Sequence, residues 1–98
     1  MDGYKSLMEI SKTKLVVIDF SAEWCGPCKY IGPIFEKLSD EIDTVVFAKV
    51  DVDEADDVAG LCGISAMPTF QFFRNGQKID ELMGANVEAL HQKVAQHK

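Results

Sequence analysis

The sequence has few of the features that mark membrane or secreted proteins. Its uninterrupted apolar runs are short, such as the four residues of Leu15–Ile18, whereas roughly 20 are needed to cross a bilayer. The N-terminal sequence, MDGYKSLMEI, has neither the cationic start nor the apolar stretch of roughly 7–15 residues that a secretory signal needs. We therefore expect neither a membrane protein nor a secretory precursor.

Basic residues are also scarce. Ten Lys and Arg stand against sixteen Asp and Glu, which gives a formal net charge of −6 at pH 7. Because a surface of this sign repels phosphate backbones, we expect no nucleic-acid partner. The hydrophobic fraction of 47% is nevertheless that of a globular protein. The 98 residues contain no repeat or linker, so they predict one domain over residues 1–98.

Cysteine is the third scarce residue type, with three in the chain. Two of them form the motif Cys25-Gly26-Pro27-Cys28, and Cys62 has no neighbour in sequence with which to pair. Three cysteines are too few for a small protein held together by disulfides. In the cytoplasm, where we expect this protein to be, a lone close pair indicates thiol chemistry or a metal more than a structural bridge.

Apolar periodicity predicts helices and strands that alternate along the chain. In chain order these are a helix over 3–12 capped by Asp2, a strand over Leu15–Phe20, a helix over Cys28–Ile42, a strand over Val45–Val52, a helix that starts near Asp53 and ends at Gly60 or Gly63, a hairpin of Thr69–Arg74 and Gln77–Met83 around Asn75-Gly76, and a last helix capped by Asn86. Alternating strands and helices predict parallel pairs, and the hairpin adds an antiparallel pair. We expect an α/β fold with a mixed sheet of about four strands and helices on both faces.

The two close cysteines fall where the first strand ends and a helix begins. Unpaired N–H groups at a helix start point at the sulfur of Cys25 and favour its thiolate. Cys28 follows one turn later, near enough to form a small ring with Cys25. Pro27 stiffens this turn, and Gly26 leaves the first sulfur open to other molecules. The motif predicts thiol–disulfide exchange in which Cys25 attacks a disulfide and Cys28 resolves the mixed disulfide.

Two other interpretations of the cysteine pair stay open. The same spacing supplies half of a zinc site, with Cys62, His91 or His97 as candidate further ligands. The pair could also be inert and buried. A proline and a helix start hold the sulfurs more firmly than the loose loop of a zinc knuckle, so we expect no metal. We expect solvated histidines and a Cys62 that packs as a small apolar residue, with a regulatory or dimerising thiol as the alternative.

Five separated motifs resemble those of the thioredoxin family. They are WCGPCK at 24–29 after KLVVIDFSAE, the helix-internal Pro33, Lys49 within FAKVDVDE, Met67-Pro68-Thr69 before FQFF, and the glycines Gly76 and Gly84. The match runs from Lys14 to about Leu90. It implies a thioredoxin-like fold and a protein disulfide reductase. The Gly-Pro pair between the cysteines is similar to that of the reducing members of the family.

The resemblance also implies partners. Members of the family bind no cofactor themselves, and their electrons come from NADPH through a thioredoxin reductase, while their substrates are disulfide-containing proteins. They usually begin with a strand before the first helix, and we find no counterpart here, so Val45–Val52 is expected to form a sheet edge. Lower stability, pairing with another chain and truncation all stay open. We expect a monomer, with a dimer through this edge or through Cys62 as the alternative.

Asp19 interrupts a strand that should be covered on both faces. Burial makes a carboxylate costly to ionise, so we expect a raised pKa for Asp19. The resemblance implies that Asp19 lies beneath the resolving cysteine and moves its proton, with Lys49 as its partner. A purely structural Asp19 and a solvated Lys49 are the alternatives.

Pro68 stands at the start of a predicted strand, where the missing N–H costs no ladder bond. The resemblance implies a cis peptide bond that faces the cysteines, and a Met67 backbone that binds an extended substrate segment. A trans proline that merely marks a turn is the alternative. An apolar surface around Cys25 is predicted from small residues and adaptable methionines. Its members are Trp24, Gly26, Pro27, Met67, Met83, Gly84 and Ala85.

The rival function is a binding module that uses the same surface and whose redox state acts as a switch. Binding alone does not need Asp19, so a buried acid beside an intact cysteine pair favours catalysis. Ordinary core packing is the alternative for Met83.

Overall fold

Four helices and four strands make up the part of the chain that the structure describes, residues 2–98, in a computed structural model. They are α1 (Asp2–Ile10), β1 (Leu15–Ser21), α2 (Gly26–Glu41), β2 (Val45–Asp51), α3 (Asp56–Leu61), β3 (Thr69–Arg74), β4 (Gln77–Met83) and α4 (Val87–His97). The predicted order of elements is confirmed. None of the helices within residues 2–98 has the length and apolar character that crossing a membrane requires.

The strands form one mixed sheet in the order β2-β1-β3-β4. Strand β1 is parallel to β2 and antiparallel to β3, and β3 is antiparallel to β4. All seven residues of β1 are buried, as the continuous apolar run of a central strand predicts. Among the described residues β2 is an edge strand, which confirms the expected sheet edge.

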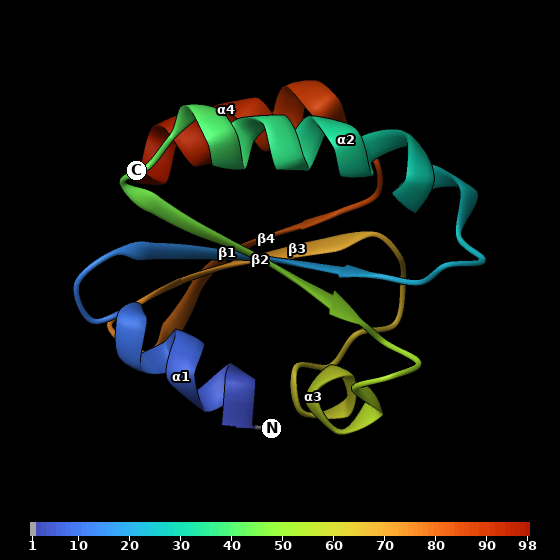
Figure 1. Ribbon diagram of the computed structural model, residues 1–98, viewed down its shortest axis with the longest axis horizontal. Coiled ribbons are helices and arrows are strands. Elements are labelled where there is room, and N and C mark those ends of the chain that lie inside the picture. The colour runs from blue at the N-terminus through green and yellow to red at the C-terminus, as the bar shows by residue number, and fades with distance from the viewer. Residues whose placement is uncertain (1) are drawn as a thin grey trace.

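Helices cover both faces of the sheet, as Figure 1 shows: α2 and α4 lie on one face, and α1 and α3 on the other. Successive residues of β1 point to opposite faces. Val17 therefore belongs to the core under α2 and α4, with Phe35 and Phe70, whereas Ile18 belongs to the second core, with Phe73. Burial of each large apolar side chain stabilises the fold by about 2 kcal/mol. Both cores therefore hold β1, and the residues that follow its end, in place.

The β3–β4 hairpin has the bounds that the sequence predicts. Asn75 and Gly76 both have positive φ, 57° and 74°, which is the type of two-residue turn that Asn-Gly favours. The register shifts between Phe72 and Phe73, and Ile79 is the extra residue on β4. This bulge re-aims the side chains that follow the turn, so that Asp80 faces α4.

Several predicted boundaries are wrong by one to three residues. Helix α1 includes Asp2 and ends at Ile10 instead of residue 12. It stops because the hydroxyl of Ser11 donates to the Met8 carbonyl and accepts the Gly76 N–H, which ties this end of α1 to the hairpin turn. Helix α2 begins at Gly26 rather than at Cys28, since Cys25 caps it. Helix α2 ends at Glu41 instead of Ile42, and α3 begins at Asp56 instead of near Asp53, because the Asp51 carboxylate accepts the N–H groups of Asp53 and Glu54 in a turn. Strand β1 extends to Ser21, and β2 ends at Asp51.

Candidate active site

The two cysteines meet at the junction of β1 and α2, as predicted. Cys25 is the N-cap of α2, with an extended backbone (φ −87°, ψ 111°), and its sulfur accepts the backbone N–H of Cys28 at 3.2 Å. The two sulfurs form a disulfide, and the Cα atoms are 5.2 Å apart. Cys25 is only 6% exposed in this form, so the expectation of an open first sulfur is wrong here, although Gly26 and Pro27 beside it are exposed.

Asp19 lies in the middle of β1 and is 1% exposed. Its Oδ1 atom has no hydrogen-bond partner among the described residues. Loss of hydration raises the pKa of Asp19 to about 6, although the nearby charge of Lys49 acts in the opposite direction. Lys49 on β2 is the cross-strand neighbour of Asp19, and Lys49 is exposed to solvent. The predicted burial and the predicted direction of the pKa shift are confirmed.

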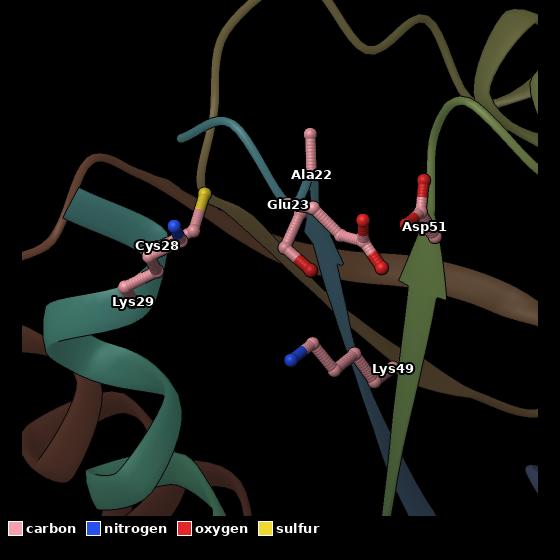
Figure 2. A pocket seen from close by; sticks show the side chains of 7 residues that line it. Ala22, Glu23, Cys28, Lys29, Lys49 and Asp51 are labelled. Atoms are coloured by element: carbon pink, nitrogen blue, oxygen red, sulfur yellow. The ribbon is translucent and has the colours of Figure 1, made fainter. Parts of the chain in front are cut away.

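A cavity of about 450 Å³ opens beside Cys28. Figure 2 shows its labelled walls, with the Lys49 side chain extending from β2 toward the side where Cys28 lies. Its lining residues are Ser21, Ala22, Glu23, Cys28, Lys29, Lys49 and Asp51. Glu23 and Asp51 are charged members that the sequence analysis did not single out, because nothing in the sequence shows which residues near the strand ends line the cavity. At roughly 30 Å³ of liquid volume per water, a cavity of this size has room for several waters.

The Met67–Pro68 peptide bond is cis, as the resemblance implies. The carbonyl of Pro68 accepts the N–H of Gly84 at 2.8 Å, which ties the start of β3 to the loop after β4. Gly84 has a φ of 94°, a conformation that side chains strain. Met67 is half-buried and packs against Cys25 and Cys28. These contacts bring the two loops to the same end of the sheet as the disulfide.

The remaining members of the predicted apolar surface divide into two groups. Trp24 and Met83 are 67% and 60% exposed, and the Trp24 indole N–H donates to Asp53 at 2.8 Å. Core packing for Met83 is therefore excluded. Ala85, in contrast, is half-buried and packs against the core under α2 and α4. Its side chain thus supports the loop more than it offers contact area.

The candidate zinc ligands do not join the cysteine pair. Among residues 2–98, no three His, Cys, Asp or Glu side chains are placed to hold a metal ion. Cys62 is half-buried, and burial raises the pKa of its thiol. His91 is exposed, whereas His97 is not solvated as expected: its Nε2 lies 2.8 Å from an Oδ2 atom of Asp80.

A disulfide whose first sulfur caps a helix, with a buried acid on the strand that precedes it, suits the exchange of disulfides with other molecules. The class of protein that this fold and site define is therefore a thiol–disulfide oxidoreductase. Sequence comparison gives the family: the model of the thioredoxin family matches residues 4–96. The chain belongs to the thioredoxin family, and it is a disulfide reductase with a C-x-x-C active site.

Named relatives agree with this assignment. A thioredoxin of Ictalurus punctatus is 53% identical over 100 residues, which cover 100% of this chain and 94% of the relative. The X-ray structure of Fasciola hepatica thioredoxin has a TM-score of 0.93 and 44% identity, covering 96% of this chain and 90% of that one. A third similar structure comes from work on the thiol resolving mechanism in yeast mitochondrial 1-Cys peroxiredoxin via glutathione/thioredoxin systems. It has a TM-score of 0.86 and 40% identity, covering 94% of this chain and 88% of that one.

Proposed function

We propose that Cys25 is the attacking thiolate and Cys28 the resolving thiol. The Cys25 thiolate attacks one sulfur of a substrate disulfide, and the other substrate sulfur leaves as a thiolate. Cys28 then loses its proton and attacks the sulfur of Cys25, which releases the second substrate thiol and forms the Cys25–Cys28 disulfide. The observation that carries this assignment is the N–H of Cys28 donated to the sulfur of Cys25, because the same position at the helix start stabilises negative charge there.

Asp19 is the acceptor for the Cys28 proton. A general base works best when its pKa lies near the working pH, and burial raises the pKa of Asp19 to about 6. Its Oδ1 has no hydrogen-bond partner among residues 2–98, so it can accept the proton through a water molecule. Lys49 tunes the acid, because its positive charge opposes part of the burial effect. The cavity that Cys28 and Lys49 both line offers room for the water.

Protein substrates dock over the two loops next to the disulfide. The backbone of Met67 pairs with an extended segment of the substrate, as in strand addition, and Pro68 fixes the start of β3 beside it. The other docking residues are Trp24, Gly26, Pro27, Gly84 and Ala85. Trp24 and Pro27 supply exposed apolar area that suits varied protein surfaces, whereas the half-buried Gly84 and Ala85 shape the loop beside them.

Electrons reach the disulfide from NADPH through a thioredoxin reductase, since the reaction consumes two electrons for each substrate disulfide. Disulfide-containing proteins are the substrates, and the likeness to a structure from work on thiol resolution in a peroxiredoxin via glutathione/thioredoxin systems supports this class. We place the reaction in the cytoplasm, where thiols are kept reduced. Residues 1–98 act as one domain and as a monomer, and size-exclusion chromatography with light scattering distinguishes this from a dimer through β2 or Cys62.

Trapping of mixed disulfides tests the roles of the two cysteines. The Cys28→Ser variant should accumulate mixed disulfides with protein substrates through Cys25, whereas Cys25→Ser should trap none. The opposite pattern would reverse the roles. Dithiothreitol-coupled insulin reduction tests the activity itself, and a pure, folded protein without activity would leave only the binding module.

A further inference from the structure

Tyr30 is an exposed aromatic residue that the reaction described above does not use. It is 65% exposed, which is close to the 67% of Trp24 in the active-site surface. A single exposed aromatic residue needs no explanation by itself. Its position on α2, however, places it next to the residues that surround the disulfide.

Helical spacing puts Tyr30 on the same outward face as Gly26 and Pro27. It follows them by four and three residues, the spacings at which helical side chains are neighbours. The opposite face of α2 packs on the sheet, and its buried residues are Cys28, Ile31, Gly32, Phe35 and Leu38. At 1.5 Å per residue, Tyr30 lies about 6 Å along the helix from Gly26. It therefore continues the active-site surface by one turn.

The same face of α2 continues from Tyr30 to a cavity of about 320 Å³. Ile34 and Lys37 follow Tyr30 by four and seven residues, so they lie on one stripe. The cavity is lined by Ile34, Lys37, Leu38, Glu41, Val87 and His91. Figure 1 shows α2 and α4 on the same face of the sheet, and these residues come from both helices. Its apolar members are buried or half-buried, whereas Lys37, Glu41 and His91 are exposed.

We propose that Tyr30 and the α2–α4 cavity form a recognition surface for the segment that flanks the reacting cysteine of a protein substrate. This proposal rests on the proposed function and adds a specificity-determining residue to it. The occupant follows from continuity, because the stripe begins at Pro27 beside the disulfide and ends in the cavity. The Tyr30 ring offers the apolar area for this contact.

The length of the stripe sets the reach of the substrate. From Pro27 to Lys37 the helix rises by about 15 Å, which about five residues of extended chain can span. The recognised protein therefore carries an apolar side chain about five positions from its reacting cysteine. A small aromatic disulfide reaches only the cysteine pair, so its reaction rate should not depend on the residues of the stripe. The structure thus predicts a preference for protein over small-molecule disulfides that depends on Tyr30.

Tyr30→Ala, Tyr30→Phe and Leu61→Ala test this preference. Leu61 is the matched control, because it is 61% exposed and ends α3, on the other face of the sheet. The measured quantity is kcat/KM for insulin divided by the rate constant with 5,5′-dithiobis(2-nitrobenzoate). We expect this ratio to fall about tenfold in Tyr30→Ala, mainly through KM. It should stay within about twofold of the wild type in Tyr30→Phe and in Leu61→Ala.

An unchanged ratio in Tyr30→Ala, with normal insulin reduction by the wild type, would overturn this inference and leave the proposed function intact. Failure of the wild type to reduce insulin would instead contradict the proposed function. Disulfide-bearing peptides test the cavity directly, with Leu or Ser placed about five positions to either side of the cysteine. The Leu peptide should react several times faster in one of the two directions, and equal rates in both would contradict the proposed reach.

Discussion

Two aspartates, Asp19 on β1 and Asp80 on β4, have pKa values shifted in opposite directions by their surroundings. Asp19 is buried, and its Oδ1 has no hydrogen-bond partner among the described residues. Asp80 accepts hydrogen bonds from Lys93 at 2.9 Å and pairs with His97 at 2.8 Å. Burial raises the pKa of Asp19 to about 6. For Asp80, burial acts upward, but the bonds from His97 and Lys93 outweigh it and lower its pKa to about 2.

The difference comes from where each strand lies in the sheet. Strand β1 is central and covered on both faces, so Asp19 loses water, and no donor in the described part of the chain replaces it at Oδ1. Strand β4 is an edge, and its bulge turns Asp80 toward the last turn of α4. Arg74 extends that contact by donating to the carbonyl of His97 at 2.6 Å. Asp19 is thus available to accept a proton, whereas Asp80 holds α4 against the sheet through Lys93 and His97.

Replacing Asp19 should give the largest effect. A pKa raised from 3.8 to about 6 opposes folding above pH 6, by about 3 kcal/mol at most, and this penalty is gone below pH 3.8. Asp19→Ala should therefore be about 2 kcal/mol more stable than the wild type at pH 8, after a small cavity cost. Its advantage should shrink as the pH falls through 6. Urea unfolding at pH 8 and pH 4.5 measures both values.

The same variant should reduce insulin about tenfold more slowly at pH 7, because the Cys28 proton loses its acceptor. Asp40→Ala, which removes an exposed acid of α2, is the control and should change neither stability nor rate appreciably. A variant at position 19 that is clearly less stable at pH 8 would refute the burial argument.

Replacing Asp80 should have the opposite sign. A lowered pKa stabilises the fold above pH 3.8, and this stabilisation is lost as the pH falls toward 2. Asp80 is partly exposed to solvent, which screens the contact, so Asp80→Ala should cost about 1–2 kcal/mol at pH 7. The loss should show in urea unfolding at pH 7. Equal stability of the variant and the wild type at pH 7 would contradict the claim that the contacts of Asp80 with α4 stabilise the fold.

Ser11→Ala should have the smallest effect of the three. The Ser11 hydroxyl is fully buried, donates to the Met8 carbonyl and accepts the Gly76 N–H at 2.8 Å. Its loss should cost about 1 kcal/mol in thermal or urea unfolding without changing insulin reduction. Thr13→Ala, whose exposed hydroxyl donates to the Ile10 carbonyl, is the control and should cost less. A Ser11 variant as stable as the wild type would show that the hydrogen bond from Gly76 to the Ser11 hydroxyl does not stabilise the fold.

Local chemistry explains why much of this could be predicted from the sequence. The Asn75-Gly76 turn sets the bounds of β3 and β4 because only a few residues adopt its positive φ angles. The side chain of Asn86 accepts the Ala89 N–H at the start of α4, as its capping role predicts. A lone acid in a continuous apolar strand predicted the burial of Asp19.

Contacts between distant segments explain what could not be predicted. His97 meets Asp80 only because the β4 bulge re-aims that side chain, and no sequence pattern marks the bulge. The early end of α1 depends on Gly76, which lies 65 positions away from Ser11. The charged cavity walls Glu23 and Asp51 come from two different strand ends. In each case the partner is set by tertiary packing.

Titration of the side-chain carboxyl carbons by NMR tests the central contrast most directly. The account predicts that Asp19 titrates with a midpoint near pH 6, whereas Asp80 stays ionised at pH 4. A midpoint for Asp19 below pH 4 would contradict the claim that this buried acid is held ready to accept a proton.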